Sequence, residues 1–144
     1  MGAALAEARA AVGAGERPHG AAAVLGQALI ASGHDEVVEK GDPTAHAVVV
    51  TLREAASRLG TRSLSGMTVF AVVEPCAMCV GAMLECDAAA LVYALPNPVD
   101  GAAGGAVQLA QHPGLGRRLQ VVSGIRREEA EELAGLPALA PTGA

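Results

Sequence analysis

Short apolar runs recur along the chain, and five of them have the length of a β-strand. The runs are Ala21–Leu25, Ala28–Ser32, Met67–Val73, Ala89–Ala94 and Leu119–Ser123. Only Gly26-Gln27 separates the first two, a spacing that predicts a β-hairpin with a tight turn. The third run is apolar almost throughout, which is typical of a central strand buried on both faces.

The segments between these runs predict helices and loops. Helices are expected over residues 3–14, 42–59, 76–85, 106–111 and 125–134, with polar loops over 33–41 and 96–105. The second helix is expected to begin at Asp42-Pro43-Thr44, because Asp is a common N-cap and Pro suits a first helical turn. This alternation of helices and strands predicts an α/β fold, a three-layer α/β/α sandwich with one five-stranded mixed sheet.

Composition narrows this prediction to one small domain. The chain has 144 residues, of which 51% are hydrophobic, enough for a single core. Phe70 and Tyr93 are its only aromatic residues, so the core must be built from Ala, Val and Leu. We expect one domain over residues 1–136 and a flexible tail over residues 137–144.

Charge and cysteine content bear on partners and location. The formal net charge is −5, whereas a nucleic-acid backbone is bound by a basic surface. No apolar run approaches the ~20 residues that a membrane span needs, and the N-terminus lacks the basic region of a secretion signal. Three cysteines in such a chain indicate a reducing compartment, where paired cysteines commonly bind metals. We therefore expect a cytoplasmic protein without a membrane partner.

His46, Cys76 and Cys79 form the strongest candidate site. Cys76 and Cys79 are three residues apart at a predicted helix start, where the helix dipole favours the thiolate that binds metal. One imidazole and two thiolates make a three-ligand Zn²⁺ site whose fourth position is open for water and chemistry. A redox-active Cys-x-x-Cys pair is the alternative, but the preceding Pro75 and the histidine motif favour a metal. Cys86 is expected to be a small buried apolar side chain.

Four motifs carry a resemblance to a known family. They are D-P-T-A-H-A at residues 42–47, E-P-C-x-M-C at 74–79, G-A-M at 81–83 and G-A-A-G at 101–104. Together they resemble the bacterial tRNA adenosine deaminases and the related guanine and cytosine deaminases of the cytidine deaminase superfamily, over about residues 3–134. The resemblance implies a five-stranded sheet between helices, zinc held by His46, Cys76 and Cys79, and a homodimer.

One departure from the family concerns the chemistry itself. In the family, zinc-activated water attacks the amine-bearing ring carbon, and a Glu two residues after the histidine shuttles the protons. Val48 stands at that position here, and the side chain of valine can neither accept nor donate a proton. General acid–base catalysis contributes ~10²–10⁴-fold to rate. We therefore expect turnover in this chain to be severely impaired.

Other departures concern the substrate pocket. The family has an Asn that hydrogen-bonds the base where this chain has Asp35, and an ionised Asp only accepts hydrogen bonds. Asp35 therefore suggests a substrate edge rich in N–H donors. His19 stands where the family has an apolar residue and could stack on the base, bond to it, or lie at the rim. Ala47 and Glu74 are further candidates for the pocket wall, Glu74 in a structural role.

Three functions remain open from the sequence. The first is a zinc deaminase-family protein for hydrolytic deamination of a free nucleobase or nucleoside, with turnover impaired by Val48. The alternatives are a non-catalytic subunit of a heterodimer and a tRNA adenosine (A-to-I) deaminase. The nearly neutral loop at residues 95–100 and an acidic last helix disfavour tRNA. The acidic residues of that helix are Glu128, Glu129, Glu131 and Glu132.

Overall fold

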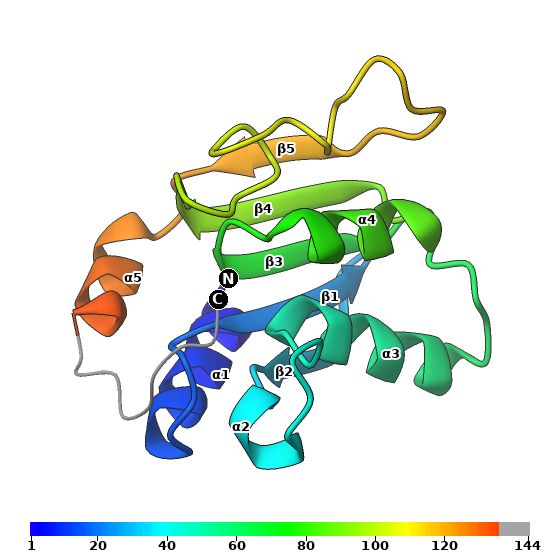
Figure 1. Cartoon of the computed structure of the whole chain (residues 1–144). Helices are drawn as coiled ribbons and strands as arrows, with labels where there is room; N and C mark the ends of the chain where they lie inside the picture. The colour runs from blue at the N-terminus through cyan, green and yellow to red at the C-terminus, as the bar shows by residue number, and fades with distance from the viewer. Residues whose placement is uncertain (136–144) are drawn as a thin grey trace.

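One mixed five-stranded sheet forms the centre of the computed structural model, which describes residues 1–135 (Figure 1). The strands are β1 (Gly20–Leu25), β2 (Ala28–His34), β3 (Thr68–Val73), β4 (Ala90–Leu95) and β5 (Gln120–Ser123). Their spatial order is β2-β1-β3-β4-β5. β1 is antiparallel to both of its neighbours, whereas β3, β4 and β5 are parallel to one another. The predicted hairpin, the mixed sheet and the central place of the third strand are confirmed.

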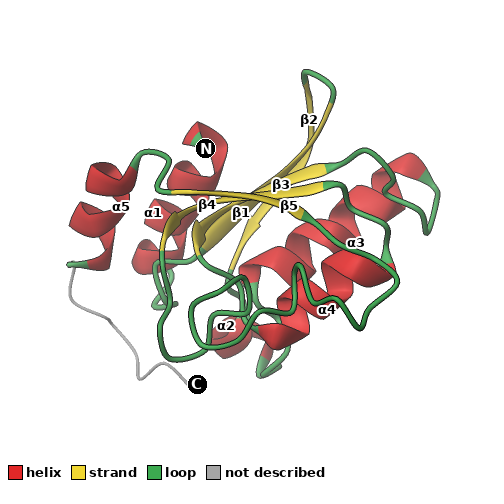
Figure 2. Cartoon of the chain, turned by 90° about the horizontal axis from the view of Figure 1, so that it is seen from above, coloured by secondary structure: helices red, strands yellow, loops and turns green. Residues whose placement is uncertain are grey.

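Helices cover both faces of the sheet and complete three layers (Figure 2). The helices are α1 (Gly2–Gly13), α2 (Val37–Lys40), α3 (Ala47–Leu59), α4 (Ala77–Glu85) and α5 (Arg127–Ala134). α1 and α5 lie on one face, and α3 and α4 lie on the other. Each face has its own cluster of buried apolar side chains, so the sheet separates two cores. The predicted three-layer sandwich is therefore confirmed.

The small residues of the chain allow helix and sheet to approach closely. A side chain at Gly20, the first residue of β1, would place its Cβ atom 2.1 Å from the carbonyl oxygen of Ala4 in α1. Ala4 and Ala8 of α1 are fully buried against this face. Helix and sheet therefore pack closely in a chain that has only two aromatic side chains.

Two predicted helices differ from the structure. The segment after Asp42 does not begin a helix, because the carboxylate of Asp42 accepts hydrogen bonds from the backbone amide and hydroxyl of Thr44 and closes a turn. The helix α3 begins later, at Ala47, with His46 as its N-cap. The predicted helix over residues 106–111 is wrong as well. Backbone amides in this region pair with the carbonyl oxygens of Gly101 and Ala102 and hold the segment as a folded loop.

The short helix α2 lies within the segment that was predicted to be a loop. The side chain of Glu16 accepts hydrogen bonds from the backbone amides of Val38 and Glu39 at 2.7 and 2.9 Å. Glu16 is 4% exposed, so a buried carboxylate from another part of the chain caps this helix. The tail predicted over residues 137–144 lies outside the described residues. Within the described residues, no helix has the length and apolar character to cross a membrane.

Candidate metal centre and substrate pocket

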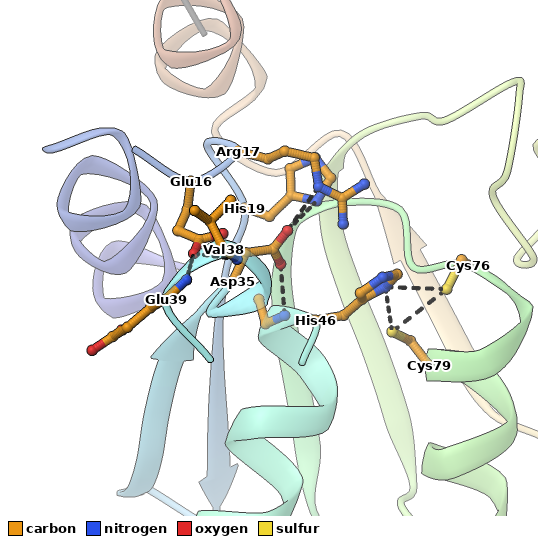
Figure 3. Close-up of polar contacts among 10 residues, drawn as sticks. Glu16, Arg17, His19, Asp35, Val38, Glu39, His46, Cys76 and Cys79 are labelled. Atoms are coloured by element: carbon orange, nitrogen blue, oxygen red, sulfur yellow. Dashed lines mark hydrogen bonds and ion pairs between the residues drawn. The ribbon is translucent and has the colours of Figure 1, made fainter. Parts of the chain in front are cut away.

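The candidate metal ligands lie where two helices begin on the same side of the sheet. His46 is the N-cap residue of α3, and Cys76 is the N-cap residue of α4, each with an extended backbone. Strand β3 ends at Val73, three residues before Cys76, and so delivers α4 to this position. Cys79 follows in the first turn of α4 and is buried. The two helix starts therefore bring together three residues of which the first and the last are thirty-three positions apart in sequence (Figure 3).

The three ligand atoms have the spacing of a zinc site. The Nδ1 atom of His46 lies 3.5 Å from Sγ of Cys76 and 3.6 Å from Sγ of Cys79, and the two sulfur atoms are 3.6 Å apart. With Zn–S bonds of about 2.3 Å and Zn–N bonds of about 2.0 Å, tetrahedral angles require N–S and S–S separations of roughly 3.5 and 3.8 Å. The residues therefore fit one face of a zinc tetrahedron and would leave its fourth position open.

Electrostatics at the trio favour a thiolate at Cys76. The hydrogen bond from the Cys79 thiol, aided by one from His46, lowers the pKa of Cys76 to about 3. The contact with Cys76 raises the pKa of His46 and, together with burial, raises that of Cys79. The trio therefore favours one thiolate and one thiol, and a metal ion bound there would have to displace the proton of the second thiol.

A cavity of about 180 Å³ opens beside the ligand trio. Val48, which is 4% exposed, lies in its wall together with Ala47, two residues of the first turn of α3. The position that the resemblance assigns to a proton-carrying Glu therefore faces the cavity with an alkyl side chain. Carboxylates in the wall come only from Asp35, Glu74 and Asp100 among the described residues.

Glu74 holds the wall of the cavity in shape. Its side chain is 1% exposed, and its two oxygens accept hydrogen bonds from the backbone amides of Asn97, Ala103 and Gly105 at 2.8 to 3.1 Å. A Cβ atom at Gly101 would lie 2.4 Å from the Glu74 carboxylate, so only glycine allows this close approach. Glu74 thus anchors the loop over residues 97–105, which supports the structural role expected from the sequence.

Both side-chain oxygens of Asp35 accept hydrogen bonds from other parts of the protein. Its Oδ1 atom accepts a hydrogen bond from the amide of Ala47 at 2.8 Å, and its Oδ2 atom accepts one from Nε of Arg17 at 2.8 Å (Figure 3). The carboxylate is 1% exposed, and it interacts favourably with the N-terminus of α3. Asp35 therefore fixes the turn that carries His46, and its oxygens are less free for a ligand than the sequence suggested.

His19 lies beside this ion pair and lines the cavity. Its Nδ1 atom is 3.8 Å from Oδ2 of Asp35, and its side chain is 27% exposed. Burial lowers the pKa of His19 to about 4, although the charge of Asp35 opposes the shift. His19 is therefore neutral near pH 7 and presents a flat, uncharged ring to the cavity.

Arg17 is the residue of the pocket that the sequence analysis missed. It comes from the loop before β1, lines the cavity and is 15% exposed. The available signal was Asp35, because a carboxylate in the pocket wall needs a cation when it is buried. Cys86 lies outside the metal site, as expected, but it is only partly buried against the core rather than fully buried.

Comparison with known proteins shows the family of this chain. Residues 1–95 match the family described as the cytidine and deoxycytidylate deaminase zinc-binding region. The chain belongs to this family. The tRNA-specific adenosine deaminase of Bacillus subtilis is 34% identical over 126 residues, which are 88% of this chain and 78% of that protein. The resemblance that the motifs carried is thereby confirmed.

Two further proteins are similar to this chain over most of its length. A solved structure from studies of A-to-I editing by tRNA:A34 deaminases superposes with a TM-score of 0.89 at 34% identity, over 92% of this chain and 96% of that chain. The tRNA(Ile)-lysidine synthase of Deinococcus radiodurans is 42% identical over 135 residues, 92% of this chain and 23% of that protein. The chain thus spans about a quarter of the length of that relative.

Proposed function

We propose that this chain binds one zinc ion through His46, Cys76 and Cys79 and takes a nucleobase into the adjoining cavity. The reaction is hydrolytic deamination, at a rate severely reduced by Val48. The observation that carries the proposal is the combination of a zinc-like ligand trio with an alkyl side chain in the cavity wall beside it. Zinc, when bound, supplies an activated water.

The chain's own residues offer no replacement for the missing proton carrier. Both oxygens of Asp35 and both oxygens of Glu74 accept hydrogen bonds from protein donors. Asp100 lies in an exposed loop at the rim, where water screens it. Proton transfer to and from the reacting ring therefore lacks a positioned group, which general acid–base catalysis requires.

Restoring the carboxylate tests this proposal. In the zinc-loaded protein, Val48→Glu should raise ammonia release from at least one base by about 10²-fold or more. Val48→Gln is the matched control. Gln has the shape of Glu but cannot take up or release a proton near pH 7, so this variant should keep the low rate. Rapid deamination by the unaltered chain, or equal rates for the Glu and Gln variants, would contradict the proposal.

The source of the base is a separate part of the proposal. Relatives named tRNA-specific adenosine deaminases favour a base presented by tRNA. The net charge of −5 and the glutamates of α5 favour a free base or nucleoside. The comparisons thus give tRNA more weight than the sequence did. Inosine formation in an anticodon-arm RNA by the Val48→Glu variant would support tRNA, and activity on free bases alone would support a small molecule.

A further inference from the structure

We propose that Arg17 selects the ligand of this pocket, favouring a nucleobase ring that carries a carbonyl oxygen over a ring that carries only amino groups. The inference rests on the proposed function, because it concerns the same cavity. Arg17 forms an ion pair with Asp35, which the sequence did not predict. That pair reverses the hydrogen-bonding character that Asp35 alone would give the pocket.

Asp35 has little acceptor capacity left for a ligand. The amide of Ala47 and the guanidinium of Arg17 each occupy one of its oxygens at 2.8 Å. Asp35 lines the cavity together with Arg17, but its side chain is 1% exposed, so little of the carboxylate is open to a ligand. Of the two groups, the guanidinium of Arg17 is the more exposed, at 15%, so it is the more accessible to a ring edge.

Arg17 brings hydrogen-bond donors into the cavity. Nε is used by Asp35, and no described residue accepts a hydrogen bond from either Nη atom. Arg17 lines the same cavity as His46 and Val48, and the free end of its guanidinium points to the same side of Asp35 as the His46 ring (Figure 3). The two Nη groups carry four N–H donors and no acceptor. A ligand in the cavity can form hydrogen bonds with these N–H groups only if it offers an acceptor.

The charges of the site favour a neutral acceptor. The charge of Arg17 is balanced by Asp35, and two thiolates from Cys76 and Cys79 would balance a zinc ion. A ring carbonyl therefore fits better than a phosphate, which would leave an excess negative charge. Arginine is also the side chain that reads the carbonyl edge of guanine, whereas Asn or Gln reads the amino edge of adenine.

Matched ligands test the inference in the zinc-loaded protein. Guanosine is compared with 2-aminopurine riboside, which lacks the 6-oxo group, and cytosine with 4-aminopyrimidine, which lacks the 2-oxo group. Calorimetry should show each oxo ligand binding about 10- to 100-fold more tightly, the value of a hydrogen bond to a charged group. Equal affinities within both pairs would overturn the inference.

A double variant assigns the preference to Arg17. Arg17→Met/Asp35→Asn removes both charges together, so no lone charge stays buried, and the Asn oxygen still accepts from Ala47. The variant should bind zinc and lose the preference within each ligand pair, while Arg17→Lys should retain part of it. An unchanged preference in the double variant would overturn the inference. If that variant does not fold, the ligand pairs in the unaltered protein decide.

The test separates this inference from the proposed function. Rings that bind without an oxo preference refute the selection by Arg17 and leave base binding intact. No ring binding at all refutes both. Anticodon-arm RNAs that differ only in guanosine or adenosine at the wobble position distinguish RNA from free ligand as the source. Tighter binding of the adenosine RNA than of the guanosine RNA would overturn the inference. That result would still support tRNA as the source of the base.

Discussion

The Oε2 atom of Glu74 lies 2.8 Å from the backbone nitrogen of Gly105, thirty-one residues later in the chain. The same carboxylate holds the amides of Asn97 and Ala103. One buried side chain therefore secures the whole loop that forms a wall of the cavity.

Adding a methyl group to this contact should destabilise the protein. In Gly105→Ala, the new Cβ would lie 2.3 Å from the carbonyl oxygen of Asn97 and 2.6 Å from Glu74, so the loop must move. We expect a loss of about 2 kcal/mol or more in urea unfolding, as for other overpacked sites. Gly116→Ala is the control, because nothing lies within 4 Å of its Cβ position. Equal stability of the two variants would show that Glu74 does not hold the loop.

The link between Glu16 and α2 can be tested without touching the pocket. Glu16→Ala should leave the amides of Val38 and Glu39 without their acceptor, and their hydrogen exchange should accelerate. Loss of such a cap costs about 1 kcal/mol. Glu39→Ala, an exposed substitution in the same helix, should leave these exchange rates nearly unchanged. Protected amides in Glu16→Ala would mean that α2 forms without this cap.

His19 should make the stability of the fold depend on pH. The pKa of His19 in the folded chain is about 4, below its ordinary value of 6.5. Between these two pH values, His19 binds a proton in the unfolded chain but not in the folded chain. Protons then favour unfolding, and stability falls as pH decreases from about 6.5 to about 4, by an amount on the order of 2 kcal/mol.

Removing the ring should flatten this pH dependence. Urea midpoints of His19→Gln should change less between pH 7.5 and 4.5 than those of the unaltered chain. His112→Gln, which removes an exposed histidine, serves as the control and should follow the unaltered chain. Identical profiles for His19→Gln and the unaltered chain would contradict the effect of burial.

Local pattern was sufficient where local chemistry decides the structure. The apolar run around Val69 predicted the central strand, and the Pro-Cys-x-x-Cys sequence predicted α4 and its two thiols. Tertiary contacts explain the failures. Glu16 caps α2 from more than twenty residues away. The carbonyl oxygens of Gly101 and Ala102 pair with the amides of the segment over residues 106–110, which was predicted to be helical.

The same distinction applies to the pocket. The ligand trio could be recognised because each residue belongs to a motif with fixed spacing. Arg17 belongs to no motif, and its importance depends on a salt bridge to a residue eighteen positions away. The sequence alone therefore could not show that Asp35 is paired with a cation.

The zinc content of the purified protein is the decisive measurement. We predict about one zinc per chain, bound by one nitrogen and two sulfur atoms from the protein in X-ray absorption spectra. Cys79→Ser should lose the metal, whereas Cys86→Ser should retain it, because Cys86 lies outside the trio. Zinc-free protein that takes up none on addition, or equal zinc loss in both variants, would contradict the account.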